Sequence, residues 1–142
     1  MQAQATYKQA NWQVSATGFY YHIKDYILGI NQPDMDVMTI GASGVKQYQN
    51  IPYATLAGFD ATVTASIHKH IKFISGFGYT YGIDNAGAAL PLVPPAETNT
   101  TVKYQRKKWF AQLEADGALA QHRFSHAFGE DATPGYLVLN LR

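Results

Sequence analysis

The sequence contains no cysteine, which excludes a disulfide scaffold, a cysteine zinc site and a thiol nucleophile. Charged residues make up 15% of the 142 positions, well below the ~25% typical of soluble domains. The net charge is +1 and the basic residues form no stripe, so nothing predicts nucleic-acid binding. No apolar h-region of a signal peptide follows Met1. No apolar run approaches the ~18 residues of a transmembrane helix. A helical membrane protein is therefore excluded, whereas a barrel is not, because alternating strands give only a weak hydropathy signal.

Aromatic residues and glycine are plentiful instead. Aromatics reach 13%, with ten tyrosines, and there are 12 glycines. Aromatic residues favour strands and glycine favours turns, so this mixture predicts an all-β chain with many turns.

Apolar and polar residues alternate over unusually long segments. Between Thr55 and Ile67, for example, Phe59, Ala61 and Val63 fall on one face, with polar or small residues between them. A period of two predicts a half-buried strand. A strand of about a dozen residues exceeds the ~5–6 of ordinary globular strands and suits the ~9–11 of a tilted membrane-spanning strand.

The same pattern recurs along the chain and predicts seven antiparallel strands. Short polar connections, 68–70 and 106–108, alternate with long ones rich in Gly, Pro, Asn and Asp, 31–47, 84–98 and 124–135. Outer-membrane barrels alternate tight periplasmic turns and longer outer loops in this way. The predicted strands are residues 2–8, 11–28, 47–67, 71–84, 98–106, 108–123 and 135–142.

Alternation alone does not say which face meets lipid. A soluble β-barrel or sandwich would turn the apolar face inward and bind a small apolar ligand, and this is the main alternative. A non-transporting, adhesin-type barrel is a third reading. In a membrane barrel, by contrast, the polar face would line the lumen. The side chains expected there are Asp60, Lys103, Glu114, Asp116 and Arg142.

Four motifs, in order, carry a resemblance to a known family. Residues 19–27 (FYYHIKDYI) and 48–61, with YQNI followed by ATLAGFDA, resemble a strand and its return strand in TonB-dependent receptor barrels. Residues 90–95 (LPLVPP) are similar to a loop of that family. The family's ending resembles residues 121–123 (QHR), 133–136 (TPGY) and 139–141 (LNL). Four motifs in family order are far more specific than any one of them.

The resemblance implies a partial transmembrane β-barrel, about seven strands of a larger plugged barrel in the outer membrane of a Gram-negative bacterium. Such barrels close with roughly 22 strands, so residues 1–142 are expected to form part of the barrel domain, without the plug or the last strands. The implied function is TonB-energised uptake of a scarce nutrient, such as a ferric siderophore or another metal chelate. The implied partners are the lipid bilayer, the plug, TonB and a small-molecule chelate substrate.

No catalytic constellation stands out. Ser125 and His126 are adjacent, with Glu130 and Asp131 nearby, but a hydrolytic triad is a matter of geometry that one loop does not supply. We therefore expect no enzyme activity and no cofactor. Soft thioethers suit Cu(I) and imidazole suits several metals. On that basis, the expected substrate contacts in the outer loops are Met35, Met38, His122 and His126.

Overall fold

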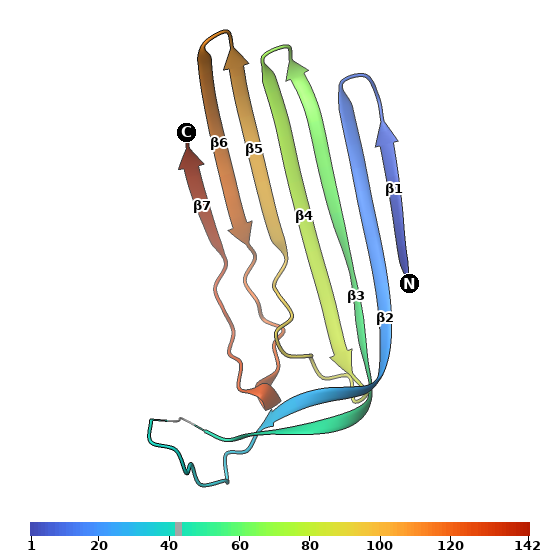
Figure 1. The fold of residues 1–142 in the computed structure, drawn as a ribbon, viewed down its shortest axis with the longest axis vertical. Helices are drawn as coiled ribbons and strands as arrows, with labels where there is room; N and C mark the ends of the chain where they lie inside the picture. Colours follow the sequence, from blue (N-terminus) through green and yellow to red (C-terminus); the bar gives the residue numbers. More distant parts are fainter. Residues whose placement is uncertain (42–43) are drawn as a thin grey trace.

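A computed structural model describes residues 1–41 and 44–142, and it contains one antiparallel sheet (Figure 1). Each strand pairs with the next along the chain, so the sheet order is the sequence order. The predicted connection 31–47 includes residues 42–43, which lie outside the described residues. The strands are β1 (Gln2–Lys8), β2 (Trp12–Asn31), β3 (Lys46–His68), β4 (Ile71–Asp84), β5 (Glu97–Arg106), β6 (Trp109–Ala118) and β7 (Tyr136–Leu141).

The seven predicted strands are confirmed, with one clear difference in length. β6 ends at Ala118 and not near residue 123. Past Ala118, the segments that would continue to pair with β6 contain proline. Pro94 and Pro95 precede β5 on one side, and Pro134 precedes β7 on the other. Proline has no N–H to donate to a ladder. Leu119, which falls inside the predicted strand 108–123, therefore follows the strand's end.

The register divides the side chains into two faces. Directly paired residues share a face, and the pairing is unbroken from β1 to β7 through the middle of the sheet. One, the apolar face, carries Tyr7, Val14, Phe59, Val63, Phe73, Phe77, Tyr79, Tyr81, Val102, Leu113, Leu139 and Leu141. The other, the polar face, carries Thr17, Asp60, Thr62, Thr64, Lys72, Asn99, Lys103, Glu114, Asp116 and Asn140, with Arg142 opposite Gln112 at its edge.

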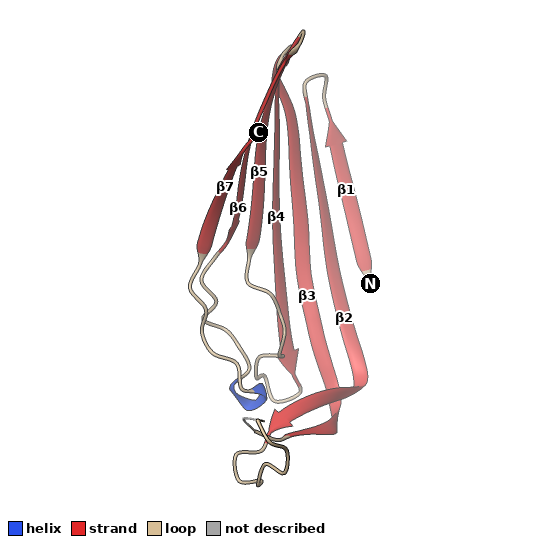
Figure 2. Ribbon diagram, turned by 60° about the vertical axis from the view of Figure 1, so that its left-hand side comes forward, coloured by secondary structure: helices blue, strands red, loops and turns tan. Residues whose placement is uncertain are grey.

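The apolar face is uncovered in the described residues. Leu139 is 64% exposed and Trp109, the first residue of β6, is 77% exposed. Among all the described residues, the buried apolar side chains are Leu28, Ala54, Leu90 and Ala118, too few for a conventional core. The structure is thus a single open sheet with free edges at β1 and β7 (Figure 2), and not the soluble sandwich or closed barrel of the alternative interpretation.

The β2–β3 hairpin bends sharply near its outer end. Asp25 adopts a left-handed backbone, with φ of 51°, and stands opposite Pro52, where no pair forms. Past this point, the hairpin turns across the end of the sheet where the long connections lie (Figures 1 and 2). It meets the short 3₁₀ helix η1 (His126–Phe128). Within the described residues, no helix has the length and apolarity to span a membrane.

Candidate functional site

Three long connections come together at one end of the sheet, which we call the loop end. They are the outer part of the β2–β3 hairpin, the β4–β5 connection (85–96) and the β6–β7 connection (119–135). The Lys46 Nζ lies 3.2 Å from the centroid of the Phe128 ring. A Cβ added at Gly29 would lie 3.1 Å from the same ring. The hairpin and η1 are therefore in direct contact.

Glu130 joins two of these connections. Its Oε1 accepts a hydrogen bond from the Leu92 N–H at 2.7 Å, and its Oε2 accepts one from the Ser125 N–H at 2.9 Å. Leu92 has a φ of 59°, a costly backbone for a residue with a side chain. The carboxylate therefore helps to hold an otherwise unfavourable turn in the β4–β5 connection, because bonds to a charged acceptor are strong.

Ser125 has a structural role at the start of η1. The residue is buried and its Oγ accepts a hydrogen bond from the Phe128 N–H at 3.4 Å, as the N-cap of η1. The His126 ring packs against the Phe124 ring in a tilted arrangement, with 4.4 Å between ring centroids. Both Glu130 oxygens accept hydrogen bonds from backbone N–H groups, and in the part of the chain that the structure describes no hydrogen bond joins the side chains of Ser125, His126 and Glu130 as a triad would require.

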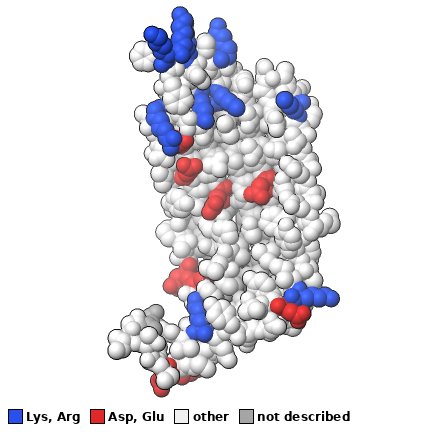
Figure 3. Space-filling view, viewed as in Figure 1, with Lys and Arg blue, Asp and Glu red and all other residues white. Residues whose placement is uncertain are grey.

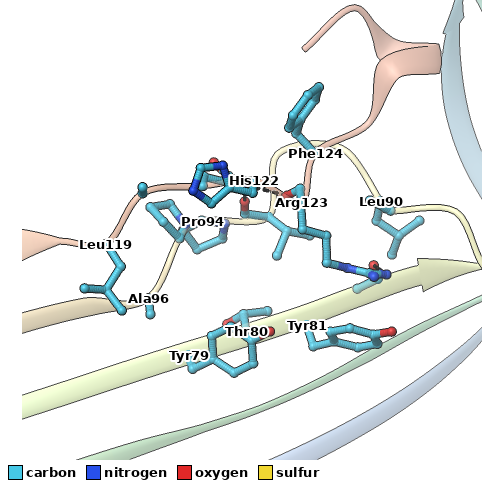
Figure 4. Close-up of a pocket in the computed structure, with 16 residues that line it drawn as sticks. Tyr79, Thr80, Tyr81, Leu90, Pro94, Ala96, Leu119, His122, Arg123 and Phe124 are labelled. Atoms are coloured by element: carbon cyan, nitrogen blue, oxygen red, sulfur yellow. Dashed lines mark hydrogen bonds between the residues drawn. The ribbon is translucent and has the colours of Figure 1, made fainter. Parts of the chain in front are cut away.

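A cavity of about 510 Å³, which we call the β4–β6 cavity, opens beside the outer part of β4 (Figure 4). It exists because β5 begins only at Glu97, opposite Gly78, and leaves the rest of the β4 edge without that partner. Segment 119–124 runs along the gap instead. The cavity is lined by Tyr79, Thr80, Tyr81, Gly82, Ala89, Leu90, Val93, Pro94, Pro95, Ala96, Leu119, Ala120, Gln121, His122, Arg123 and Phe124.

Arg123 reaches across this gap from the β6–β7 connection to β4 (Figure 4). Its guanidinium carbon lies 4.1 Å from the centroid of the Tyr81 ring, a cation–π distance. Its Nη2 donates to the Gly82 carbonyl at 3.4 Å. Gln121 makes a second link, its Nε2 donating to the Val93 carbonyl at 2.7 Å. Side chains thus replace the missing strand ladder here.

A second cavity lies on the other side of segment 90–94. It has a volume of about 350 Å³ and shares Thr80, Leu90, Val93 and Pro94 with the first. Its remaining walls come from the bent hairpin, from Leu56 on the polar face, from Pro91 and Leu92, and from Phe128 of η1. Segment 90–94 and Thr80 therefore lie between the two cavities.

The structure spreads the four predicted substrate contacts over two loops. His122 lines the β4–β6 cavity, and His126 belongs to η1. Met35 and Met38 stand in the β2–β3 loop, 48% and 98% exposed. Within the described residues, neither cavity at this end is lined by Met35, Met38 or His126, and no group of three or more His, Cys, Asp or Glu residues is placed to hold a metal.

Sequence analysis missed the two charged residues that organise this end. Arg123 entered only as part of a motif, and Glu130 only as a neighbour of a rejected triad. A signal was available, because ionisable residues are scarce in this chain and each of these two lies in a long connection. Their partners, Tyr81 and Leu92, come from other parts of the chain, so only the fold identifies them.

On the polar face, acidic and basic side chains occupy different positions along the length of the strands (Figure 3). Acidic side chains lie across its middle, where Asp60, Glu97 and Asp116 surround a depression of about 300 Å³ that includes Gly76 and Gly78. The predicted polar-face residues Asp60, Lys103, Glu114, Asp116 and Arg142 do share this face. Basic residues gather instead toward the short connections, at Lys8, Lys69, Lys72, Lys103, Arg106, Lys107 and Lys108.

Comparison with known proteins gives one family. The family described as "TonB dependent receptor-like, beta-barrel" matches residues 3–142. The solved structure of the copper transporter OprC is similar to the chain, with a TM-score of 0.84 and 21% sequence identity. The match covers 99% of this chain and 22% of OprC, so the chain spans less than a quarter of that protein's length. At this identity the likeness establishes the fold. No curated protein sequence matches the chain.

Proposed function

The chain belongs to the TonB-dependent receptor β-barrel family, and from this membership we propose that it is a wall segment of an outer-membrane receptor that imports a scarce nutrient. In this proposal the plug, the contact with TonB and the remaining strands come from parts of the receptor outside these residues. The chain's own task is to span the membrane, line the lumen and carry outer loops. It catalyses no reaction and holds no cofactor.

The observation that carries the proposal is the continuous apolar face. Seven strands in register place large apolar side chains on one face, with no second layer over them in the described residues. Leaving six such side chains in water forgoes on the order of 10 kcal/mol, as much as the whole stability of a typical domain. A bilayer removes that cost, and the polar face then lines the lumen.

The two ends of the sheet suggest its orientation. Long connections gather at one end and tight turns at the other, as in outer-membrane barrels whose longer loops face the outside. The loop end, with its hairpin folded inward against η1, is therefore proposed to face the medium. The acidic middle of the polar face and the basic short-turn end would face the plug and the periplasm.

The proposed substrate is a metal chelate, a ferric siderophore or a similar complex, that meets the loop end from the medium. We propose Met35, Met38 and His126 as contacts, since thioether and imidazole groups recognise metal-bearing ligands. His122 was predicted with them, but it lines the β4–β6 cavity and contacts a substrate only if that substrate enters there. Copper is a second candidate: exposed Met35 and Met38 suit Cu(I), and the similar structure OprC is named a copper transporter.

Uptake by cells tests the proposal. Three strains are compared: one that lacks the complete receptor gene, the same strain complemented with that gene, and a TonB-deficient strain. Each receives radiolabelled iron as a panel of siderophore chelates and, separately, radiolabelled copper. We expect one substrate class to enter the complemented strain at least about tenfold faster than the other two strains. Uptake that persists without TonB would overturn the proposal. So would uptake by the complemented strain that equals uptake by the deletion strain for both iron and copper.

A further inference from the structure

We propose that the β4–β6 cavity binds the phosphate-bearing headgroup of a lipid in the outer leaflet, with Arg123 as the residue that holds the phosphate. The inference rests on the membrane placement proposed above. It adds a ligand, of a different class from the imported nutrient, on the opposite side of the barrel wall.

The position of the cavity points to lipid. Tyr79 pairs with Phe59 and Tyr81 pairs with Ala57, so both tyrosines extend the apolar face toward the loop end. Figure 4 shows both rings at β4, with the Arg123 side chain reaching from segment 119–124 to the Tyr81 ring, and both tyrosines line the cavity. Aromatic rings at the ends of membrane strands lie at headgroup level. The cavity therefore opens where phosphates of the outer leaflet are found.

Its charge favours an anion. The lining includes Arg123 and His122 but neither Asp nor Glu. The ion pair between described residues is that of Arg142 with Glu114, so Arg123 has no carboxylate partner there. A guanidinium has five N–H donors, and one nitrogen of Arg123 makes a long bond, to the Gly82 carbonyl. The remaining donors are available, and guanidinium binds phosphate with two parallel hydrogen bonds.

Its walls favour an amphiphile over a free ion. Around Arg123 the cavity is formed largely by apolar side chains, among them Leu119, Pro95 and Ala96. At about 510 Å³ it holds much more than one phosphate. The Tyr81 ring fixes the guanidinium at one side, so a phosphate bound there would leave the apolar walls to sugar faces or acyl carbons. The same cation disfavours a bare metal ion at the adjacent His122.

Native mass spectrometry of the complete receptor in neutral detergent would test this. The probes are bisphosphorylated lipid A, the same lipid after phosphatase treatment, and inorganic phosphate. We expect lipid A to bind, removal of its phosphates to weaken binding about tenfold or more, and millimolar inorganic phosphate not to compete. Equal binding of both lipids would overturn the anion role, and displacement by inorganic phosphate would show a free-anion site instead.

Variants then locate the site. Arg123→Gln should weaken lipid A binding about tenfold. Arg123→Lys should weaken it less, because lysine keeps the positive charge and loses only the paired N–H donors of the guanidinium. Arg142→Gln is the matched control, since it removes the same charge from the edge of the polar face. Heat-modifiable migration on gels reports whether each barrel is folded. Folded Arg123 variants that bind like the parent would refute the proposal, while uptake of the nutrient tests the proposed function separately.

Discussion

The Phe19 ring lies directly over Gly58 on the neighbouring strand. The two residues are paired across β2 and β3, and a Cβ added at Gly58 would lie 2.5 Å from the ring's Cζ and 2.5 Å from the Tyr79 carbonyl oxygen. Phe19 breaks the alternation of its strand by placing an aromatic ring on the polar face. The pairing continues through it without a bulge, because a residue with no side chain stands opposite.

Gly58→Ala should therefore destabilise the folded barrel. The Phe19 ring can rotate, but the Tyr79 carbonyl belongs to the β4 ladder, so we expect an overpacking cost of about 1–3 kcal/mol. Urea unfolding of the receptor in lipid would measure it. Gly18→Ala is the matched control: its new Cβ would meet a Gly58 backbone oxygen at 3.9 Å, an ordinary contact. Equal effects of both substitutions would argue against close packing at Gly58.

Spin labels on adjacent β3 residues should report opposite environments. A label at Val63 should be relaxed by a lipid-soluble reagent and one at Thr64 by a water-soluble one, because neighbours on a strand project to opposite faces. Their partners on β2, Val14 and Gln13, should repeat the result. Equal access of the lipid-soluble reagent at Val63 and Thr64 would rule out the assignment of the apolar face to lipid.

Glu130→Gln should loosen the loop end without unfolding the sheet. The amide retains one acceptor oxygen, so one of the two backbone N–H bonds is lost, and each bond to a charged acceptor contributes about 1.5–3 kcal/mol. Hydrogen exchange should become faster by about tenfold or more at the amide of Leu92 or of Ser125, while amides in the middle of β3 stay protected. Asp131→Asn, the same chemical change at the next residue, is the control and should leave both amides unaffected.

The 142-residue chain by itself should not be a soluble monomer. Its sheet has free edges at β1 and β7 that can pair with other chains. Its apolar face exposes more surface than the few hundred Å² found on soluble monomers. Light scattering in buffer without detergent should show large assemblies. A compact 15.7 kDa species with a cooperative thermal transition would contradict both this expectation and the membrane placement.

The sequence by itself determined the strands and their two faces. Alternation is a local property: each residue of Thr55–Ile67 is assigned a face by its neighbours in the chain, and the connecting turns are marked by their own glycines and prolines. The predicted polar-face residues accordingly share one side of the sheet, although they come from different strands. Family motifs spread along the whole chain led in the same way to a family that the comparison confirmed.

The loop end was decided only by the tertiary structure. The end of β6 depends on prolines in the segments beside it, and the bend of β2 depends on Pro52 standing opposite Asp25. The β4–β6 cavity exists because β5 begins only opposite Gly78, and across that gap Arg123 lies beside Tyr81, 42 positions earlier in the chain. No local pattern encodes such a distance. Strand faces follow from the geometry of one strand, whereas a site between strands follows from which strands are neighbours and where their pairing stops.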